Sequence, residues 1–235
     1  MYGVEAVPET LFRNRLDAGG KLAHALEPQR DDSTVVVGLA RGGVVVAAGV
    51  ARSLNVPLDA LAVRKVRHPW QPEYAIGAVT PDGSVFLRAV DGLTEAEVAQ
   101  AVTAAQQSAQ ELDRRLHEHY ATLDLTGKSV LAVDDGLATG ATMVAATRWA
   151  RAGGARCVVA SAPVGSVAAA ALLRAEADRV VCPIESDHFW AVGLWYADFE
   201  QVTDQEVLEL LHEAATRANA PRPRDPSLSR RSAAQ

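Results

Sequence analysis

The chain has 235 residues, of which 49% are hydrophobic and 22% charged, a composition that is usual for a globular protein with a sizeable core. Its formal net charge of −6 excludes a global basic surface for nucleic acid or an anionic membrane, so an anionic ligand would need a local cluster of positive side chains. With neither a signal-peptide core nor an apolar stretch of about 18 residues, the sequence predicts a cytoplasmic protein.

The first half of the chain alternates between helical and strand patterns. Apolar residues at helical spacing predict an opening helix over residues 11–27, and the continuous apolar run 34–40 predicts a parallel strand that is buried on both faces. A helix that ends before Pro57 and a strand over residues 58–66 follow. The Pro-Asp-Gly sequence at 81–83 then predicts a hairpin turn between two short strands.

The second half begins with a capping-box pattern at Thr94 and Glu97, which predicts a long helix that ends near Tyr120. Further strands are predicted over residues 129–135, 156–162 and 179–184, and further helices over residues 140–153, 166–176 and 204–216. Strands that alternate with helices indicate an α/β fold with a doubly wound, mostly parallel sheet. Ligands of such sheets bind beyond the carboxyl ends of the strands.

Residues 1–216 form the predicted domain, in which the hairpin and long helix of residues 75–122 stand out as an insertion suited to be a lid or hood. Residues 217–235 hold five arginines and one aspartate without apolar periodicity, which predicts a disordered tail rich in Arg and Pro. Cys157 and Cys182 lie in apolar, strand-like runs. They are therefore interpreted as small buried side chains rather than as a disulfide or a metal pair.

One stretch carries the strongest functional signal, VLAVDDGLATGAT at residues 130–142. An apolar strand leads there into Asp134 and Asp135, and then into a loop of small residues that opens a helix. Such a loop lets backbone N–H groups converge on an anion, and the helix N-terminus favours negative charge. Two carboxylates beside it suit hydrogen-bond donors such as vicinal ribose hydroxyls, or a divalent cation. The stretch therefore predicts a sugar-phosphate site, and it is no Walker A loop because no Lys follows Gly140.

This stretch resembles the phosphoribosyl-pyrophosphate (PRPP) motif of type I phosphoribosyltransferases, in which an apolar strand, two acids and a Thr-Gly-x-Thr loop follow one another. The segments LARGGVVVA, LAVRKVRHPWQPEYAIGAV and FWAVGLWYADFEQVTDQEV are similar to one bacterial subgroup of predicted phosphoribosyltransferases, so the resemblance covers most of residues 12–212. It implies a Mg²⁺-dependent transferase of nucleotide metabolism. Such an enzyme moves 5-phosphoribose from PRPP to a nitrogenous, aromatic acceptor and releases pyrophosphate. A homodimer is the usual assembly in this fold.

The resemblance also implies roles for individual residues. Asp134 and Asp135 would hold the ribose hydroxyls and the Mg²⁺ ion, and they form the implied catalytic set together with Arg41 and Lys65. The 5′-phosphate loop would consist of Gly136, Ala138, Thr139, Gly140, Ala141 and Thr142. The pyrophosphate would lie on Arg41, Gly42 and Gly43 and on Arg64 and Lys65, which are expected to end the strand 58–66. Arg67 and His68 fit an extension of that cluster and a plain loop equally well.

The acceptor is less well specified. Trp190 and Phe189 match the aromatic loop that stacks on the base in purine enzymes of this family, although packing of Phe189, Trp190 and Trp195 between the last strand and the C-terminal helix explains them equally well. Enzymes for 6-oxopurines carry an Asp where this chain has Ala138, which counts against an oxopurine acceptor.

Two further observations keep other functions open. Related sequences carry arginines ahead of the PRPP strand where this chain has HEHYATLDLTGK, so Arg114 and Arg115 are candidates to replace them. A non-catalytic protein that senses PRPP or a nucleotide is the main alternative, although no DNA-binding domain or basic face accompanies the domain. A sugar-phosphate hydrolase is a third reading, but no nucleophile or metal-protease motif is present to support it.

Overall fold

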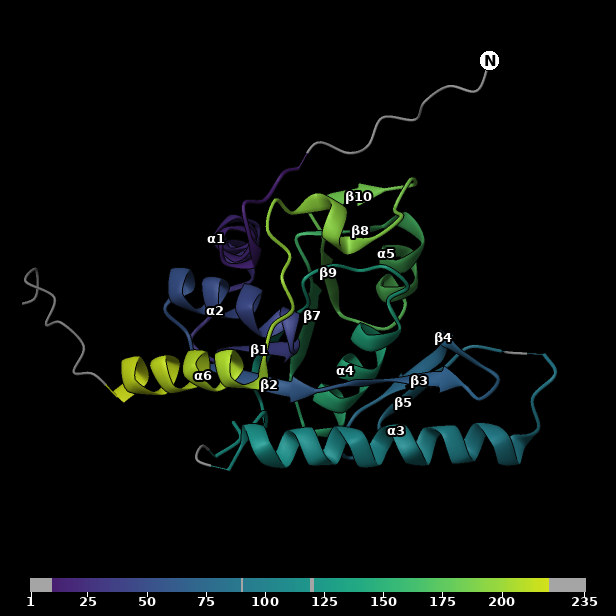
Figure 1. The fold of residues 1–235 in the computed structure, drawn as a ribbon. Helices are drawn as coiled ribbons and strands as arrows, with labels where there is room; N and C mark the ends of the chain where they lie inside the picture. Colours follow the sequence, from purple (N-terminus) through teal and green to yellow (C-terminus); the bar gives the residue numbers. More distant parts are fainter. Residues whose placement is uncertain (1–9, 90, 119–120, 220–235) are drawn as a thin grey trace, which may run out of the picture.

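The computed structural model describes residues 10–89, 91–118 and 121–219 (Figure 1). Its centre is a sheet of five parallel strands in the order β2-β1-β6-β7-β9. These strands are β1 (Thr34–Ala40), β2 (Leu58–Ala62), β6 (Ser129–Val133), β7 (Cys157–Ser161) and β9 (Arg179–Val181). The three inner strands are continuous apolar runs because helices cover both faces of the sheet. The predicted doubly wound, mostly parallel α/β fold is confirmed.

Helices lie on both faces of this sheet (Figure 1). They are α1 (Arg15–Leu26), α2 (Gly42–Leu54), α4 (Ala141–Ala152), α5 (Val167–Arg174) and α6 (Asp204–Asn219). α1 and α2 bury Leu22 and Val50 on one face, whereas α4 buries Val144 on the other. Gly19 lets α1 approach α2 closely, since a Cβ atom there would lie 2.2 Å from the Val46 carbonyl oxygen.

A second, antiparallel sheet leaves the central one at Arg64. It contains β3 (Arg64–His68), β4 (Gln71–Val79) and β5 (Val85–Leu87), and the helix α3 (Glu95–Leu116) packs along it (Figure 1). Val66 and Ile76 of the sheet pack against Val98 and Val102 of the helix. We call residues 64–116 the arm. Its hairpin turn and the capping box before its helix were both predicted correctly.

The predicted strand over residues 58–66 is wrong, because the chain changes sheets within it. β2 ends at Ala62 in the parallel sheet, and β3 begins at Arg64 and pairs with β4. Arg64 and Lys65 therefore open a strand of the arm instead of closing a strand of the central sheet. The sequence hides the break because no Gly or Pro separates the two strands.

Several element ends also differ from the prediction. The opening helix begins at Arg15 because Asn14 is extended and its side chain caps the Asp17 N–H, while Phe12 pairs with Tyr196. The long helix ends at Leu116, since His117 turns its ring toward Asp59. The predicted end at Tyr120 lies outside the described residues.

Two more corrections concern the last third of the chain. The predicted strand 179–184 is split into β9 and β10 (Ile184–Ser186), and β10 pairs with β8 (Val164–Ser166) in a small sheet of its own. α6 continues to Asn219, so residues 217–219 of the predicted tail are helical. Residues 220–235 lie outside the described part of the chain.

The two thiols take no part in a disulfide. Cys157 and Cys182 are free and half-buried at the edges of the core, and burial raises the pKa of Cys182 to about 12. Among the described residues, no cluster of three or more His, Cys, Asp or Glu side chains could hold a metal ion. No helix in the described ranges is long and apolar enough to cross a membrane.

Candidate active site

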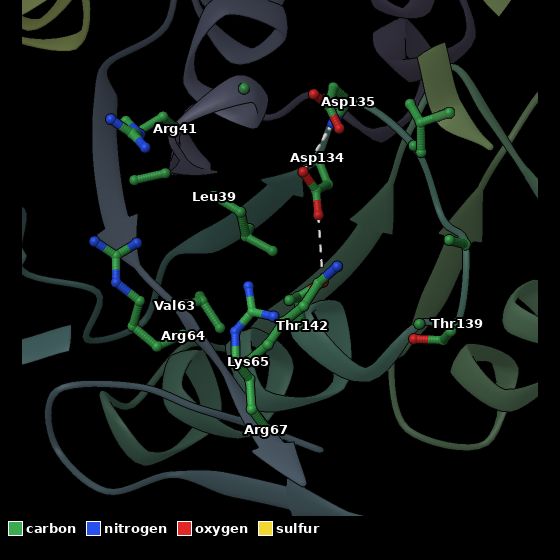
Figure 2. Close-up of a pocket in the computed structure, with 16 residues that line it drawn as sticks. Leu39, Arg41, Val63, Arg64, Lys65, Arg67, Asp134, Asp135, Thr139 and Thr142 are labelled. Atoms are coloured by element: carbon green, nitrogen blue, oxygen red, sulfur yellow. Dashed lines mark hydrogen bonds between the residues drawn. The ribbon is translucent and has the colours of Figure 1, made fainter. Parts of the chain in front are cut away.

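A cavity of about 460 Å³ lies at the carboxyl edge of the central sheet (Figure 2). Five segments meet there: the ends of β1 and β6, the loop before α4, β3 of the arm, and the segment that holds Val192. Eleven of the predicted PRPP-binding residues line it: Arg41, Gly42, Arg64, Lys65, Asp134, Asp135, Gly136, Ala138, Thr139, Gly140 and Thr142. The topology thus brings together groups that are far apart in the sequence.

Asp134 and Asp135 follow directly after the central strand β6. The Asp134 carboxylate accepts hydrogen bonds from the backbone N–H of Asp135 (2.9 Å) and from the Thr142 hydroxyl (3.3 Å). Burial and the adjacent Asp135 carboxylate raise the pKa of Asp134. Two carboxylates with so few internal donors are poised to accept hydrogen bonds from a ligand or to bind a cation.

Asp135 is held by residues that the sequence analysis missed. Arg15 donates from Nε to Asp135 Oδ2 (2.8 Å) and from Nη1 to the Glu200 carbonyl (2.8 Å), and its guanidinium lies 3.6 Å above the Phe199 ring. Tyr196 donates its hydroxyl to the Asp135 carbonyl oxygen (2.6 Å). These partners come from α1 and from the segment before α6, so no local sequence pattern could have linked them to the acid pair.

The glycines after β1 allow α2 to approach the acid pair. A Cβ atom on Gly42 would lie 2.1 Å from Asp135 Oδ2, and one on Gly43 would lie 2.7 Å from the Val133 carbonyl oxygen. Besides the pyrophosphate role that the resemblance implies for them, these glycines allow contact with the neighbouring strand end. The Ala40–Arg41 peptide bond just before them is cis.

The loop before α4 presents free backbone donors. Gly140 has a φ of +78°, which favours glycine, and leads into the first turn of α4. In the part of the chain that the structure describes, the N–H groups of Ala138, Thr139 and Gly140 donate no hydrogen bond. Arg88 of the arm donates from Nη2 to the Thr139 carbonyl oxygen (2.7 Å), a contact that the sequence did not indicate. Free N–H groups at a helix N-terminus form an anion-binding site.

Positive side chains line the side of the cavity that faces the arm (Figure 2). Burial lowers the pKa of Arg64, and the nearby charges of Arg41 and Arg115 lower it further, whereas Asp204 opposes them. Arg41 and Arg115 each lie 3.5 Å from a carboxylate oxygen of Asp204. Arg115 thus stands beside Arg41, but neither Arg115 nor Arg114 lines the cavity, so their replacement of the missing arginines stays a prediction. A pKa lowered by like charges marks a surplus of positive charge, which an anion would relieve.

Some predicted residues lie outside the cavity. Gly43 and Ala141 contribute to the helices behind it, and His68 does not line it, whereas Arg67 does. Phe189 stacks on Trp195 at a centroid distance of 6.0 Å, within a cluster that includes Tyr196. The side chain of Trp190 is 76% exposed. The residue of that segment that does line the cavity is Val192.

Comparisons with known proteins agree with this geometry. The model of the phosphoribosyl transferase domain family matches residues 11–199. A protein of Mycobacterium tuberculosis named "Putative phosphoribosyl transferase" is 43% identical over 209 residues, which are 87% of this chain and 47% of that protein. The chain therefore spans about half the length of this relative.

Among solved structures, the protein TT1426 from Thermus thermophilus has a TM-score of 0.74 and is 40% identical, over 86% of this chain and 98% of that one. Its similarity extends over nearly the whole of that smaller chain. The protein described here belongs to the phosphoribosyl transferase domain family, with the type I fold. The resemblance to phosphoribosyltransferases that the PRPP motif indicated is confirmed.

Proposed function

We propose that the protein is a Mg²⁺-dependent phosphoribosyltransferase, which transfers 5-phosphoribose from PRPP to a nitrogenous, aromatic acceptor and releases pyrophosphate. One observation carries this proposal. A single cavity joins the acid pair, the free N–H groups before α4 and the cations of β3. These three groups match the three parts of PRPP: the ribose hydroxyls, the 5′-phosphate and the pyrophosphate.

The acid pair and the loop would hold the sugar phosphate. The ribose 2′- and 3′-hydroxyls donate to Asp134 and Asp135, and Arg15 keeps Asp135 in place from behind. The 5′-phosphate accepts from the N–H groups of Ala138, Thr139 and Gly140, and the dipole of α4 favours its charge. Transfer needs this rigid hold, because the ribose passes through an oxocarbenium-like state while both reactants stay aligned.

The cations would stabilise the leaving group. Negative charge develops on pyrophosphate as its bond to the ribose carbon breaks, and Arg41, Arg64 and Lys65 face the place where it would lie. The arm supplies two of these side chains and also reaches the phosphate loop through Arg88. Closure of the arm over the cavity would therefore complete the pyrophosphate site and exclude water in one movement.

The acid pair fits a Mg²⁺ ion that arrives with its substrate. Mg²⁺ is bound through one or two carboxylates plus phosphate and water oxygens, and the cavity offers two adjacent carboxylates. The chain alone provides no group of three or more ligating side chains within its described residues, so the phosphate oxygens would have to complete the coordination. When bound, the ion supplies positive charge against the departing pyrophosphate.

The acceptor would enter beside Val192, which lines the cavity next to Gly136. Trp190 lies two residues before Val192 and leaves three quarters of its surface uncovered, so it offers a flat face for stacking. Phe189 supports the segment through its stack on Trp195. Trp190 and Phe189 therefore remain our proposed acceptor contacts. Homodimer assembly and a cytoplasmic location also stay predictions.

Calorimetric titration of PRPP with Mg²⁺ tests the donor site. The wild type and an Asp32→Asn control, altered on the exposed surface, should bind, whereas Asp134→Asn/Asp135→Asn should not. A screen of nitrogenous bases for pyrophosphate release then tests catalysis and the acceptor class. No binding by the wild type would overturn the proposal. Binding without release from any base would instead indicate a PRPP-sensing protein.

A further inference from the structure

A second cavity of about 700 Å³ lies within the arm, between β3 and α3. The proposed transfer makes no use of it. Its walls include Arg64, Lys65 and Arg67 of β3, Trp70 of the following turn, and Ala104 and Ser108 of α3. The phosphate loop and the acid pair contribute nothing to it, and α3 contributes nothing to the first cavity. The two cavities thus share only the three cations of β3.

The cationic wall of this second cavity lacks negative partners. Arg64 donates from Nε to the Ser108 hydroxyl (3.2 Å), and Arg67 donates from Nη1 to the Pro72 carbonyl (2.5 Å). Across the described ranges, neither arginine nor Lys65 forms an ion pair with a carboxylate. The carboxylate of Glu97, which also lines the cavity, already accepts hydrogen bonds from the N–H and hydroxyl of Thr94 and from the Trp70 side chain. The wall therefore has positive charge available for an anion.

Around Trp70 and the alanines of α3 the lining is mainly apolar, with the Glu97 carboxylate hydrogen-bonded to the Trp70 side chain. Trp70 is 72% exposed, which is unusual for so large an apolar side chain, and its backbone N–H is fixed by His68 Nδ1 (3.1 Å). Ala101, Ala104 and Ala105 of α3 form a floor without bulky side chains. An indole ring above a floor of methyl groups forms a slot suited to a planar aromatic group.

We propose that this second cavity binds a nucleoside phosphate, with its base between Trp70 and the alanine floor and its phosphate on Arg64, Lys65 and Arg67. Arginine suits phosphate in particular, because its planar fork makes two parallel hydrogen bonds to phosphate oxygens. The volume of the cavity lies within the range of small-molecule sites. The slot thus selects a planar base, and the cationic wall beside it selects a phosphate.

The second cavity cannot be the binding site for the acceptor of the transfer reaction. The shared cations are those that would hold the leaving pyrophosphate, so a molecule in the second cavity lies behind the leaving group. An acceptor has to reach the ribose carbon from the opposite face. This exclusion rests on the proposed function, whereas binding of a nucleotide in the arm does not.

Sharing of the cations makes the second cavity a regulatory site. A phosphate bound within the arm draws Arg64 and Lys65 away from pyrophosphate or PRPP in the first cavity, so each ligand weakens the other. Because coupling between two sites is reciprocal, the nucleotide should raise the dissociation constant of PRPP by the same factor by which PRPP raises that of the nucleotide.

The test uses adenosine 3′-monophosphate as the probe, since it has a base and a phosphate but lacks both the 5′-phosphate and the vicinal hydroxyls that the first cavity would need. Titration into the full chain should show saturable binding. Trp70→Ala, and Ala104→Phe, which fills the slot, should each weaken binding about tenfold, in line with the loss of one base stack. The matched control Ala99→Phe, altered at an exposed position of α3 outside the cavity, should bind like the wild type.

Asp134→Asn/Asp135→Asn separates the two proposals. Unchanged binding of the probe in this variant supports a site in the arm, even if PRPP fails to bind to the wild type. Loss of probe binding in this variant would place the nucleotide in the first cavity and overturn the inference. Absence of any saturable binding to the wild type, or full binding to both Trp70→Ala and Ala104→Phe, would overturn it as well.

Discussion

Charged residues at the two edges of the central sheet have pKa values that are shifted in opposite ways. At the amino edge, Asp31 accepts hydrogen bonds from Ser33 (2.7 Å), Ser129 (2.8 Å) and Arg156 (2.7 Å). The bonds from Ser33 and Ser129 hold the pKa of Asp31 well below its usual range. At the carboxyl edge, the pKa of Asp134 is raised and that of Arg64 is lowered.

These opposite shifts show what each edge contributes. A lowered carboxyl pKa means that the fold stabilises the charge, so the amino edge adds to the stability of the protein. A raised carboxyl pKa means that the fold destabilises the charge and leaves it to be satisfied by something else. The acids and cations that line the first cavity do not pair with one another, since Asp135 pairs with Arg15 and Arg41 with Asp204, so the carboxyl edge gives up stability to keep a ligand site ready.

Of the substitutions considered, Gly42→Ala should have the largest effect on the ligand site at the carboxyl edge. The new methyl group would overlap Asp135 Oδ2, so Asp135 or Arg15 has to move. We expect a loss of about 2 kcal/mol in the free energy of unfolding and at least a tenfold loss of PRPP affinity. Urea denaturation and calorimetry measure the two effects.

Gly20→Ala is the matched control for that substitution. Gly20 lies inside α1, and a Cβ atom there meets nothing within 4 Å. The same chemical change should therefore stabilise the chain by about 0.5 kcal/mol and leave PRPP binding intact. Equal effects of the two substitutions would show that the packing of Gly42 against the acid pair has no special role.

His117→Gln should weaken a buried charge network away from the ligand site. Burial alone would lower the pKa of His117, but hydrogen bonds from its ring to Asp113 and Asp59, together with their charges, raise it to about 10. Its stabilisation is therefore fully present below pH 6.5 and is lost as the pH rises toward 10.

We expect His117→Gln to cost about 3 kcal/mol at pH 6 and progressively less up to pH 10, measured by urea denaturation across that range. His24→Gln, on the exposed face of α1, is the control and should cost little at any pH. A constant cost for His117→Gln between pH 6 and pH 10 would mean that its charge does not stabilise the fold.

Asp31→Asn should have the smallest effect, because Asp31 is partly exposed and water screens its interactions. We expect a loss of about 1 kcal/mol at pH 7 that shrinks as the pH falls below about 4, where the carboxylate of the unfolded chain becomes protonated, and vanishes only below the lowered pKa of Asp31 in the folded chain. Affinity for PRPP should not change. A reduced affinity would show that the two edges do not act independently.

The sequence predicted the central sheet and most of the first cavity, because both depend on local patterns. Apolar runs define the strands, and the acids and the small-residue loop follow β6 without interruption. The partners of Asp135 could not be predicted, since Arg15 lies 120 positions away and meets it only through the packing of α1. The start of β3 at Arg64 was missed for a related reason, because only pairing with β4 separates it from β2.

The unfolding free energy of Asp134→Asn, measured beside its PRPP affinity, tests most directly whether the carboxyl edge gives up stability for a ligand. We predict that this variant is more stable than the wild type by about 1 kcal/mol at pH 8, because a buried carboxylate with a raised pKa no longer has to ionise, and that it no longer binds PRPP with Mg²⁺. The gain in stability should disappear near pH 4. A variant that is less stable than the wild type at pH 8, or one that keeps its affinity for PRPP, would contradict this account.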